Sequence, residues 1–178
     1  MKKFFGLTLA TALIASPFFG SSASATTSDE LTSNYEIDWE KAWANQSNYN
    51  SVIDFGTDSS NSAEGTGISA AATSFKNLAT GTTSLAKSTT DNTVTSTGKT
   101  TGKNTTTNIS ATTSLKRGST LLGQSSKKVS VGKITATAKF SVTHRSFTGT
   151  TPYAGLTIHT ATDSGILYDA ATTESANY

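Results

Sequence analysis

A regular two-residue alternation over residues 134–143 constrains the fold of this chain more than any other feature. Apolar residues occupy every second position of this segment: Ile134, Ala136, Ala138, Phe140 and Val142. Successive side chains of a β-strand point to opposite faces, so the pattern predicts a strand with one buried and one wet face. The many threonines elsewhere also favour strands, because their branched Cβ suits the pleated backbone.

Other segments extend this pattern into a β fold. Residues 153–160 and 165–168 are expected to be strands, joined by an Asp-Ser-Gly turn at residues 163–165. Val129 and Val131 alternate in the opposite phase, which predicts a bulge or a turn at Gly132 and the residue after it. The chain is therefore expected to form an all-β domain, mainly an antiparallel sheet or sandwich.

The N-terminal part holds much of the aromatic content and predicts one helix. Trp39 and Trp43 are four residues apart, so they would lie on one face of a short helix over residues 36–46. Gly56 marks a break, and a Ser/Asn/Gly loop follows it. Residues 68–85 are rich in small residues and are compatible with either helix or strand.

The first 25 residues have the pattern of a secretory signal peptide cleaved after Ala25. Two lysines are followed by an apolar run and by a small-residue site at residues 23–25. The mature chain suits a single domain, with an acidic aromatic segment at 26–65 and a Ser/Thr-rich β domain at 66–178. The chain has no cysteine, as is common in exported proteins of Gram-positive bacteria, so we expect a secreted, extracellular bacterial protein.

Charge divides the mature chain into acidic, basic and acidic blocks. Residues 26–65 hold eight acids and one base, whereas residues 66–147 hold eleven Lys and Arg and one acid. The basic block could bind anionic cell-envelope polymers, anionic membrane lipids or the acidic block of another copy in a homo-oligomer. Alternatively, its lysines only keep strand faces soluble and edges unpaired. The candidate binding residues are Lys99, Lys103, Lys116, Arg117, Lys127 and Lys128.

Nucleic acid is not an expected partner, since aromatic residues are rare among these lysines and the chain is predicted to be exported.

A Ser/Thr-rich hairpin is expected between residues 93 and 115. Two threonine-rich strands flank a Gly/Lys segment at 98–103 that has the composition of a hairpin tip. A ribbon with so few apolar residues would be marginally stable, so the hairpin need not be rigid. If it inserted into a membrane, the lipid-facing side chains would be Val94, Ile109, Ala111 and Leu115.

The sequence predicts no catalytic residues, no cofactor and no metal site, and we expect a protein that is not an enzyme. His144 and His159 fall on separate predicted strands, and with Asp163 they would still leave a metal site one ligand short. Polar histidines on strand faces are the simpler interpretation. Neither a Gly-x-Ser-x-Gly nucleophile elbow nor a phosphate-binding loop occurs in the sequence.

Two functions remain open at this point. The first is a secreted, non-enzymatic protein that attacks cell envelopes or membranes, like a bacteriocin or a pore-forming toxin. In its Ser/Thr-rich composition and charged tip, the expected hairpin resembles the prestem segments of β-pore-forming toxins, which stay soluble until they pair into a barrel. The alternative is a structural protein of the cell surface or extracellular matrix that self-assembles or adheres, because opposed charges and open strand edges favour association.

Overall fold

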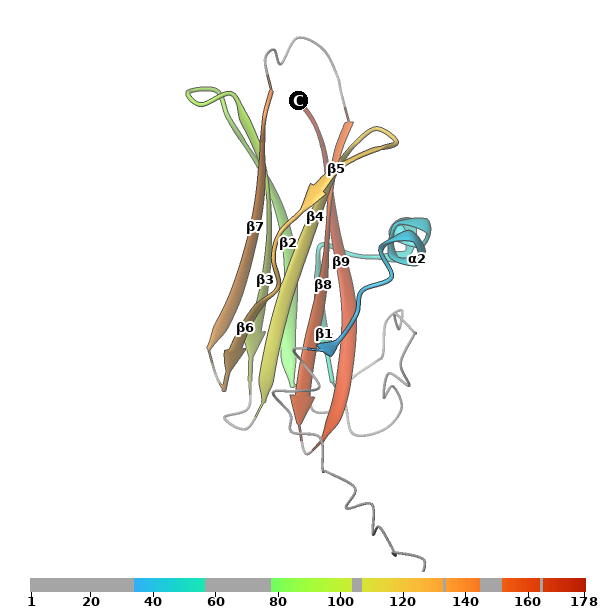
Figure 1. Ribbon diagram of the computed structural model, residues 1–178, viewed down its shortest axis with the longest axis vertical. Helices are drawn as coiled ribbons and strands as arrows, with labels where there is room; N and C mark the ends of the chain where they lie inside the picture. Colours follow the sequence, from blue (N-terminus) through green and yellow to red (C-terminus); the bar gives the residue numbers. More distant parts are fainter. Residues whose placement is uncertain (1–33, 57–77, 104–106, 133, 145–151, 164) are drawn as a thin grey trace, which may run out of the picture.

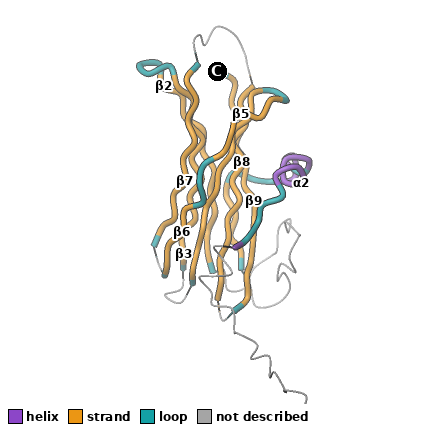
Figure 2. The backbone as a smooth tube through the Cα atoms, in the orientation of Figure 1, coloured by secondary structure: helices purple, strands orange, loops and turns teal. Residues whose placement is uncertain are grey.

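Two antiparallel sheets account for most of the described chain (Figures 1 and 2). The computed structural model describes residues 34–56, 78–103, 107–132, 134–144, 152–163 and 165–178. The predicted signal peptide and the predicted loop after Gly56 lie outside these residues. The all-β class, the antiparallel pairing and the short N-terminal helix are all confirmed.

Sheet A has the strand order β1-β2-β3-β7, and all its neighbours are antiparallel. β2 and β3 form a hairpin, whereas β7 arrives from the other sheet. The bounds are β1 Val52–Phe55, β2 Ala79–Ser88, β3 Thr93–Gly102 and β7 Thr135–Thr143. β7 is the strand predicted from the strict alternation, and its Ala136 and Ala138 are buried as expected, whereas Ile134 precedes the strand and is 59% exposed.

Sheet B has the order β5-β4-β8-β9, and β6 pairs with the part of β4 that β5 leaves free. The bounds are β4 Asn108–Arg117, β5 Thr120–Gln124, β6 Lys128–Val131, β8 Pro152–Asp163 and β9 Ile166–Asn177. The chain turns at Gly132, which has a positive φ of 77°, and passes from β6 into β7 of sheet A. A turn at this point was one of the two predicted outcomes.

The predicted hairpin between residues 93 and 115 is wrong. Its two strands exist as β3 and β4, but β3 pairs with β2 and β7, whereas β4 pairs with β5, β6 and β8. The expected tip is not a turn, because Gly98 and Lys99 lie inside β3. The two strands face each other across the sandwich instead of pairing side by side.

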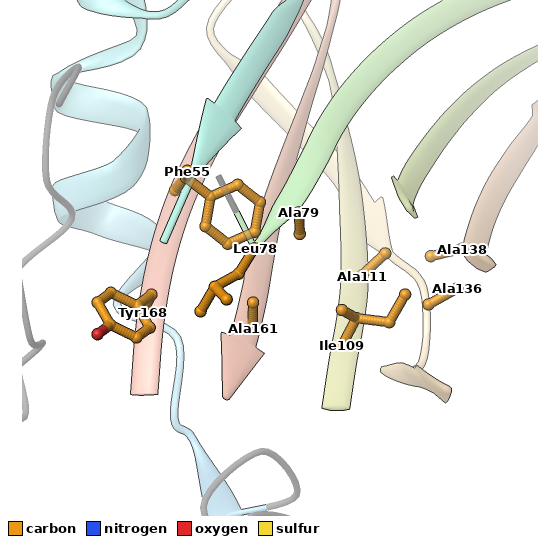
Figure 3. Close-up of a cluster of buried hydrophobic side chains, with 10 residues drawn as sticks. Phe55, Leu78, Ala79, Ile109, Ala111, Ala136, Ala138, Ala161 and Tyr168 are labelled. Atoms are coloured by element: carbon orange, nitrogen blue, oxygen red, sulfur yellow. The ribbon is translucent and has the colours of Figure 1, made fainter. Parts of the chain in front are cut away.

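Two apolar clusters fill opposite ends of the space between the sheets. The first is built on small side chains with a few large ones among them (Figure 3); its larger members are Phe55, Leu78, Ile109 and Tyr168. The second surrounds Val94, Leu115 and Tyr153 at the other ends of their strands. Between these clusters the interior is polar.

His159 of β8 is at the centre of this polar layer and is fully buried. Its Nδ1 lies 2.7 Å from Thr100 Oγ1, and its Nε2 lies 2.7 Å from Thr172 Oγ1. Thr100 donates its single hydroxyl hydrogen to the carbonyl of Ser110 at 2.7 Å, so it accepts from His159. Nδ1 therefore carries a proton. Because burial disfavours the charged ring, Nε2 is unprotonated and accepts from Thr172.

The remaining contacts extend this hydrogen-bonded chain through the sandwich. Thr83 Oγ1 of β2 bonds to Thr172 Oγ1 of β9 and lies 3.0 Å from the Thr172 carbonyl. The chain thus links β2, β9, β8, β3 and β4, and it crosses repeatedly from one sheet to the other. Burial lowers the pKa of His159 to about 3, which keeps the ring neutral. His159 thus lies on a strand face, as expected, and this face is buried.

Candidate binding surface

The N-terminal segment closes one edge of the sandwich. We call residues 35–55 the clasp; it contains the helix α2 (Trp39–Ala44), the 3-10 turn η1 (Gln46–Asn48) and β1. The predicted helix is thus confirmed in shorter form, and Asp38 caps it by accepting a hydrogen bond from the Lys41 amide at 2.9 Å. α2 lies against sheet B, on the side away from β7 (Figure 1).

Apolar side chains attach the clasp to the outer face of sheet B. β8 is buried on both faces: its inward residues meet sheet A, and its outward Leu156 and Ile158 pack under the clasp. Trp43 packs over Leu156, Ile158 and Ala171, with other aromatic side chains around it. The clasp therefore buries part of the outer face of sheet B, so that this sheet has apolar contacts on both faces.

Two consecutive carbonyls of the clasp join the two sheets. The carbonyl of Asn50 accepts the amide of Thr173 of β9 at 3.0 Å, and the carbonyl of Ser51 accepts the amide of Thr83 of β2, also at 3.0 Å. The chain then continues as β1 along β2. The open edge between β2 and β9 is thus bridged by backbone hydrogen bonds.

A buried carboxylate lies beneath the clasp. Asp169 Oδ2 accepts the hydroxyl of Tyr35 at 2.6 Å, while Asp169 Oδ1 and the hydroxyl of Tyr49 have no partner among the described residues. Burial raises the pKa of Asp169, against the lowering effect of the Tyr35 hydrogen bond. The pKa of Tyr35 is raised by burial and by the negative charge of Asp169.

Several predicted binding residues are engaged by the acidic part of the same chain. Lys116 Nζ lies 4.4 Å from the ring centroid of Trp43, and Lys127 Nζ donates to the carbonyl of Tyr35. Lys103 forms an ion pair with Asp54 at 2.9 Å. Burial lowers the pKa of Lys127. Part of the acidic and basic blocks therefore meets within one molecule.

The other predicted residues are scattered. Arg117 lies 5.8 Å from the ring centroid of Tyr153, Lys128 is exposed at the start of β6, and Lys99 is exposed on β3. The predicted insertion set is not on a surface at all, because each of its members has 0% exposure: Val94, Ile109, Ala111 and Leu115. They point between the sheets, in the apolar clusters.

Hydroxyl side chains dominate the outer face of strands β2, β3 and β7 of sheet A. We call it the threonine face; all but three of its side chains carry a hydroxyl. They are Thr80, Thr82, Ser84, Ala86 and Ser88 of β2, Thr93, Thr95, Thr97, Lys99 and Thr101 of β3, and Thr135, Thr137, Lys139, Ser141 and Thr143 of β7. No carboxylate and no aromatic ring projects from this face of the three strands. At its β1 edge, however, Asp54 lies opposite Thr80 and accepts a hydrogen bond from the Thr80 hydroxyl at 2.5 Å.

Cross-strand hydrogen bonds hold parts of the threonine face. Thr95 Oγ1 and Ser141 Oγ are 2.7 Å apart, and Thr101 Oγ1 and Thr135 Oγ1 are 3.4 Å apart. The backbones of neighbouring strands are only about 4.8 Å apart. One phosphate group can therefore accept hydrogen bonds from two strands at once.

Two ammonium groups complete this face. Lys99 and Lys139 are exposed and lie in adjacent rows, because Lys99 pairs with Thr137 and Lys139 with Thr97. This places them diagonally on neighbouring strands. Lys99 was among the predicted residues, but Lys139 was not; the alternation of residues 134–143 already placed it on the wet face.

No protein-family model matches the chain, and no curated protein is similar to it. Among the described residues, no helix is long and apolar enough to span a membrane, and no group of three or more His, Cys, Asp or Glu residues could hold a metal ion.

Proposed function

We propose that this is an exported, non-enzymatic protein that adheres to anionic polymers of the cell envelope through the threonine face. The observation that carries the proposal is the composition of this face: hydroxyl donors throughout, Lys99 and Lys139 near its middle, and no carboxylate on β2, β3 or β7. Around Lys99 and Lys139, away from Asp54 at the β1 edge, a polyol phosphate would meet hydrogen-bond donors and positive charge.

The absence of aromatic side chains on this face narrows the class of ligand. Rings provide the stacking surfaces on which bases of single-stranded nucleic acids are bound. Hydroxyls and ammoniums instead suit phosphate oxygens. A polymer with phosphate at regular intervals, such as a teichoic acid, is the ligand class that fits this chemistry.

Adhesion also requires less rearrangement than membrane attack by residues 93–115. Insertion would require β3 and β4 to leave two different sheets, and it would break the hydrogen-bonded chain around His159. Adhesion uses the fold as it stands. This is why we favour the adhesive function over the toxin-like one.

The test is binding of the purified protein to immobilised polyol phosphate polymer, at rising salt concentrations. We expect Lys99→Gln and Lys139→Gln each to weaken binding several-fold and to reduce its salt dependence, because each removes a phosphate contact. Lys128→Gln is the charge-matched control, since this lysine lies on sheet B, and it should bind like the unaltered protein.

A second pair of variants tests the face without removing a lysine. Thr97→Asp places a carboxylate opposite Lys139 and should abolish binding, whereas Ser126→Asp adds the same charge in the exposed connection between β5 and β6. Thermal unfolding checks that both variants fold. Equal binding by Lys99→Gln, Lys139→Gln and Lys128→Gln would refute the proposal, as would equal binding to a polymer without phosphate.

A further inference from the structure

The clasp is attached to parts of the domain that come much later in the sequence. Tyr35 binds Asp169, which is 134 positions away, and Gln46 contacts Thr173, which is 127 positions away. Contacts over such separations form late, since the intervening chain must be ordered first. The clasp therefore docks onto sheets that already have their other strands.

Without the clasp, two surfaces of the domain would be uncovered. Leu156, Ile158 and Ala171 form an apolar patch on sheet B, and each is at most 2% exposed when the clasp is present. The edge of β2 that pairs with β1 would also be open. An apolar patch beside an open strand edge favours association.

The connection between the clasp and the rest of the chain does not dictate which domain the clasp covers. Residues 57–77 separate Gly56 from Leu78, and these 21 residues can reach about 70 Å when extended. The longest strands of the domain have 12 residues, or about 40 Å. The clasp can therefore reach the same site on a neighbouring copy.

Opposite charges favour binding of the clasp to sheet B, and every copy of the chain carries the same charges. The clasp carries Glu36, Asp38 and Glu40, and the surface it covers presents Lys116 and Lys127 to its aromatic rings and backbone. A second molecule offers an identical arrangement. The complementarity that holds the clasp in its own domain would hold it equally on another.

We propose that the clasp is exchanged between copies, so that residues 35–55 of one molecule cover sheet B and the β2 edge of the next. Reciprocal exchange between two molecules closes a dimer, whereas onward exchange with a third molecule is head-to-tail and gives a ring or a filament. At low protein concentration the domain binds its own clasp and not that of another copy, because the tether gives its own clasp a high effective concentration. Exchange therefore grows with protein concentration during folding. This inference is independent of the adhesive function proposed above.

Disulfide trapping tests the exchange cleanly, because the chain has no cysteine of its own. Val52 of β1 lies directly opposite Thr82 of β2, at a separation suited to a disulfide. Tagged Val52→Cys and untagged Thr82→Cys proteins are refolded together at high concentration and then oxidised. We expect disulfide-linked heterodimers, several-fold more than with Thr137→Cys, which lies in the same row two strands further away.

The double variant Val52→Cys/Thr82→Cys provides the second measurement. Oxidation at low concentration locks the clasp on its own domain, so the assemblies that the reduced variant forms on concentrated refolding should disappear in light scattering. They should return after reduction and refolding. Heterodimer yields no higher than those with Thr137→Cys would overturn the proposal, and so would undiminished assembly of the oxidised double variant.

Discussion

The imidazole of His159 lies directly against Gly81, where an added Cβ would meet its Cδ2 at 2.5 Å. Gly81→Ala should therefore force β2 away from β8 and destabilise the fold by about 1–3 kcal/mol. Urea unfolding measures the change. Ser84→Ala, at an exposed position of the same strand, should leave the free energy of unfolding nearly unchanged; equal stability of both variants would show that the contact is easily relaxed.

The buried histidine should make the fold sensitive to acid. Because the pKa of His159 is lowered from 6.5 to about 3 by burial, the unfolded chain binds a proton more readily than the folded one. Its contribution to stability is complete above pH 6.5 and is lost as the pH falls from 6.5 towards 3, by up to about 1.4 kcal/mol per pH unit. His159→Gln should flatten this part of a plot of unfolding free energy against pH. An unchanged slope in the variant would assign the acid sensitivity to other groups.

Asp169 should contribute with the opposite sign. Burial raises its pKa above 3.8, so its contribution is complete below pH 3.8 and is lost as the pH rises through the raised value. The groups that act on it are the hydroxyls of Tyr35 and Tyr49 and the ammonium of Lys41. Asp169→Asn keeps an acceptor for Tyr35 but removes the buried charge.

We therefore expect Asp169→Asn to be at least as stable as the unaltered protein at pH 7, with its advantage declining towards pH 3.5. Urea unfolding at both pH values measures this. Asp91→Asn, in the exposed turn between β2 and β3, serves as the matched control. A clear loss of stability in Asp169→Asn at pH 7 would mean that the ionised carboxylate is favourable beneath the clasp.

Removing the helix cap should loosen the clasp without loosening the sheets. Asp38→Ala leaves the Lys41 amide without its acceptor, which costs about 0.5–2 kcal/mol at a helix N-terminus. Amide hydrogen exchange should become faster in α2 and stay unchanged in β3 and β8. Glu36→Ala removes an exposed charge outside the helix and provides the comparison. Uniformly faster exchange would show that clasp and sheets unfold together.

The sequence predicted individual elements much better than their partners. The alternation in β7 and the pair Trp39 and Trp43 each report on one element and its neighbours, and both predictions were confirmed. The hairpin was wrong because the same threonine pattern suits two paired strands and two strands in opposite sheets. Gly98 gave the misleading signal: it is needed inside β3, where an added Cβ would lie 2.2 Å from Thr157 Cγ2, not in a turn.

Only part of the candidate surface could be predicted from the sequence. Lys99 could be identified as a basic residue in a threonine-rich segment, but its proximity to Lys139 depends on the pairing of β3 with β7. In the same way, counting charges could not reveal that Lys127 bonds to the backbone of Tyr35. The charge blocks describe composition along the chain, whereas binding depends on which side chains share a face.

The hydrogen-bonded chain around His159 also determines which alignment of the strands is possible. Side chains such as Ala136, Ala138 and Ala170 are too small to distinguish one alignment from another by shape. If β3 slid by two residues, Thr100 would leave the imidazole and Gly98 would no longer lie against Thr157. Polar atoms without partners would then be buried, at a cost of about 1–3 kcal/mol each. In this sandwich, buried polar side chains therefore select a single alignment of the strands. In most proteins the shapes of large apolar side chains do this.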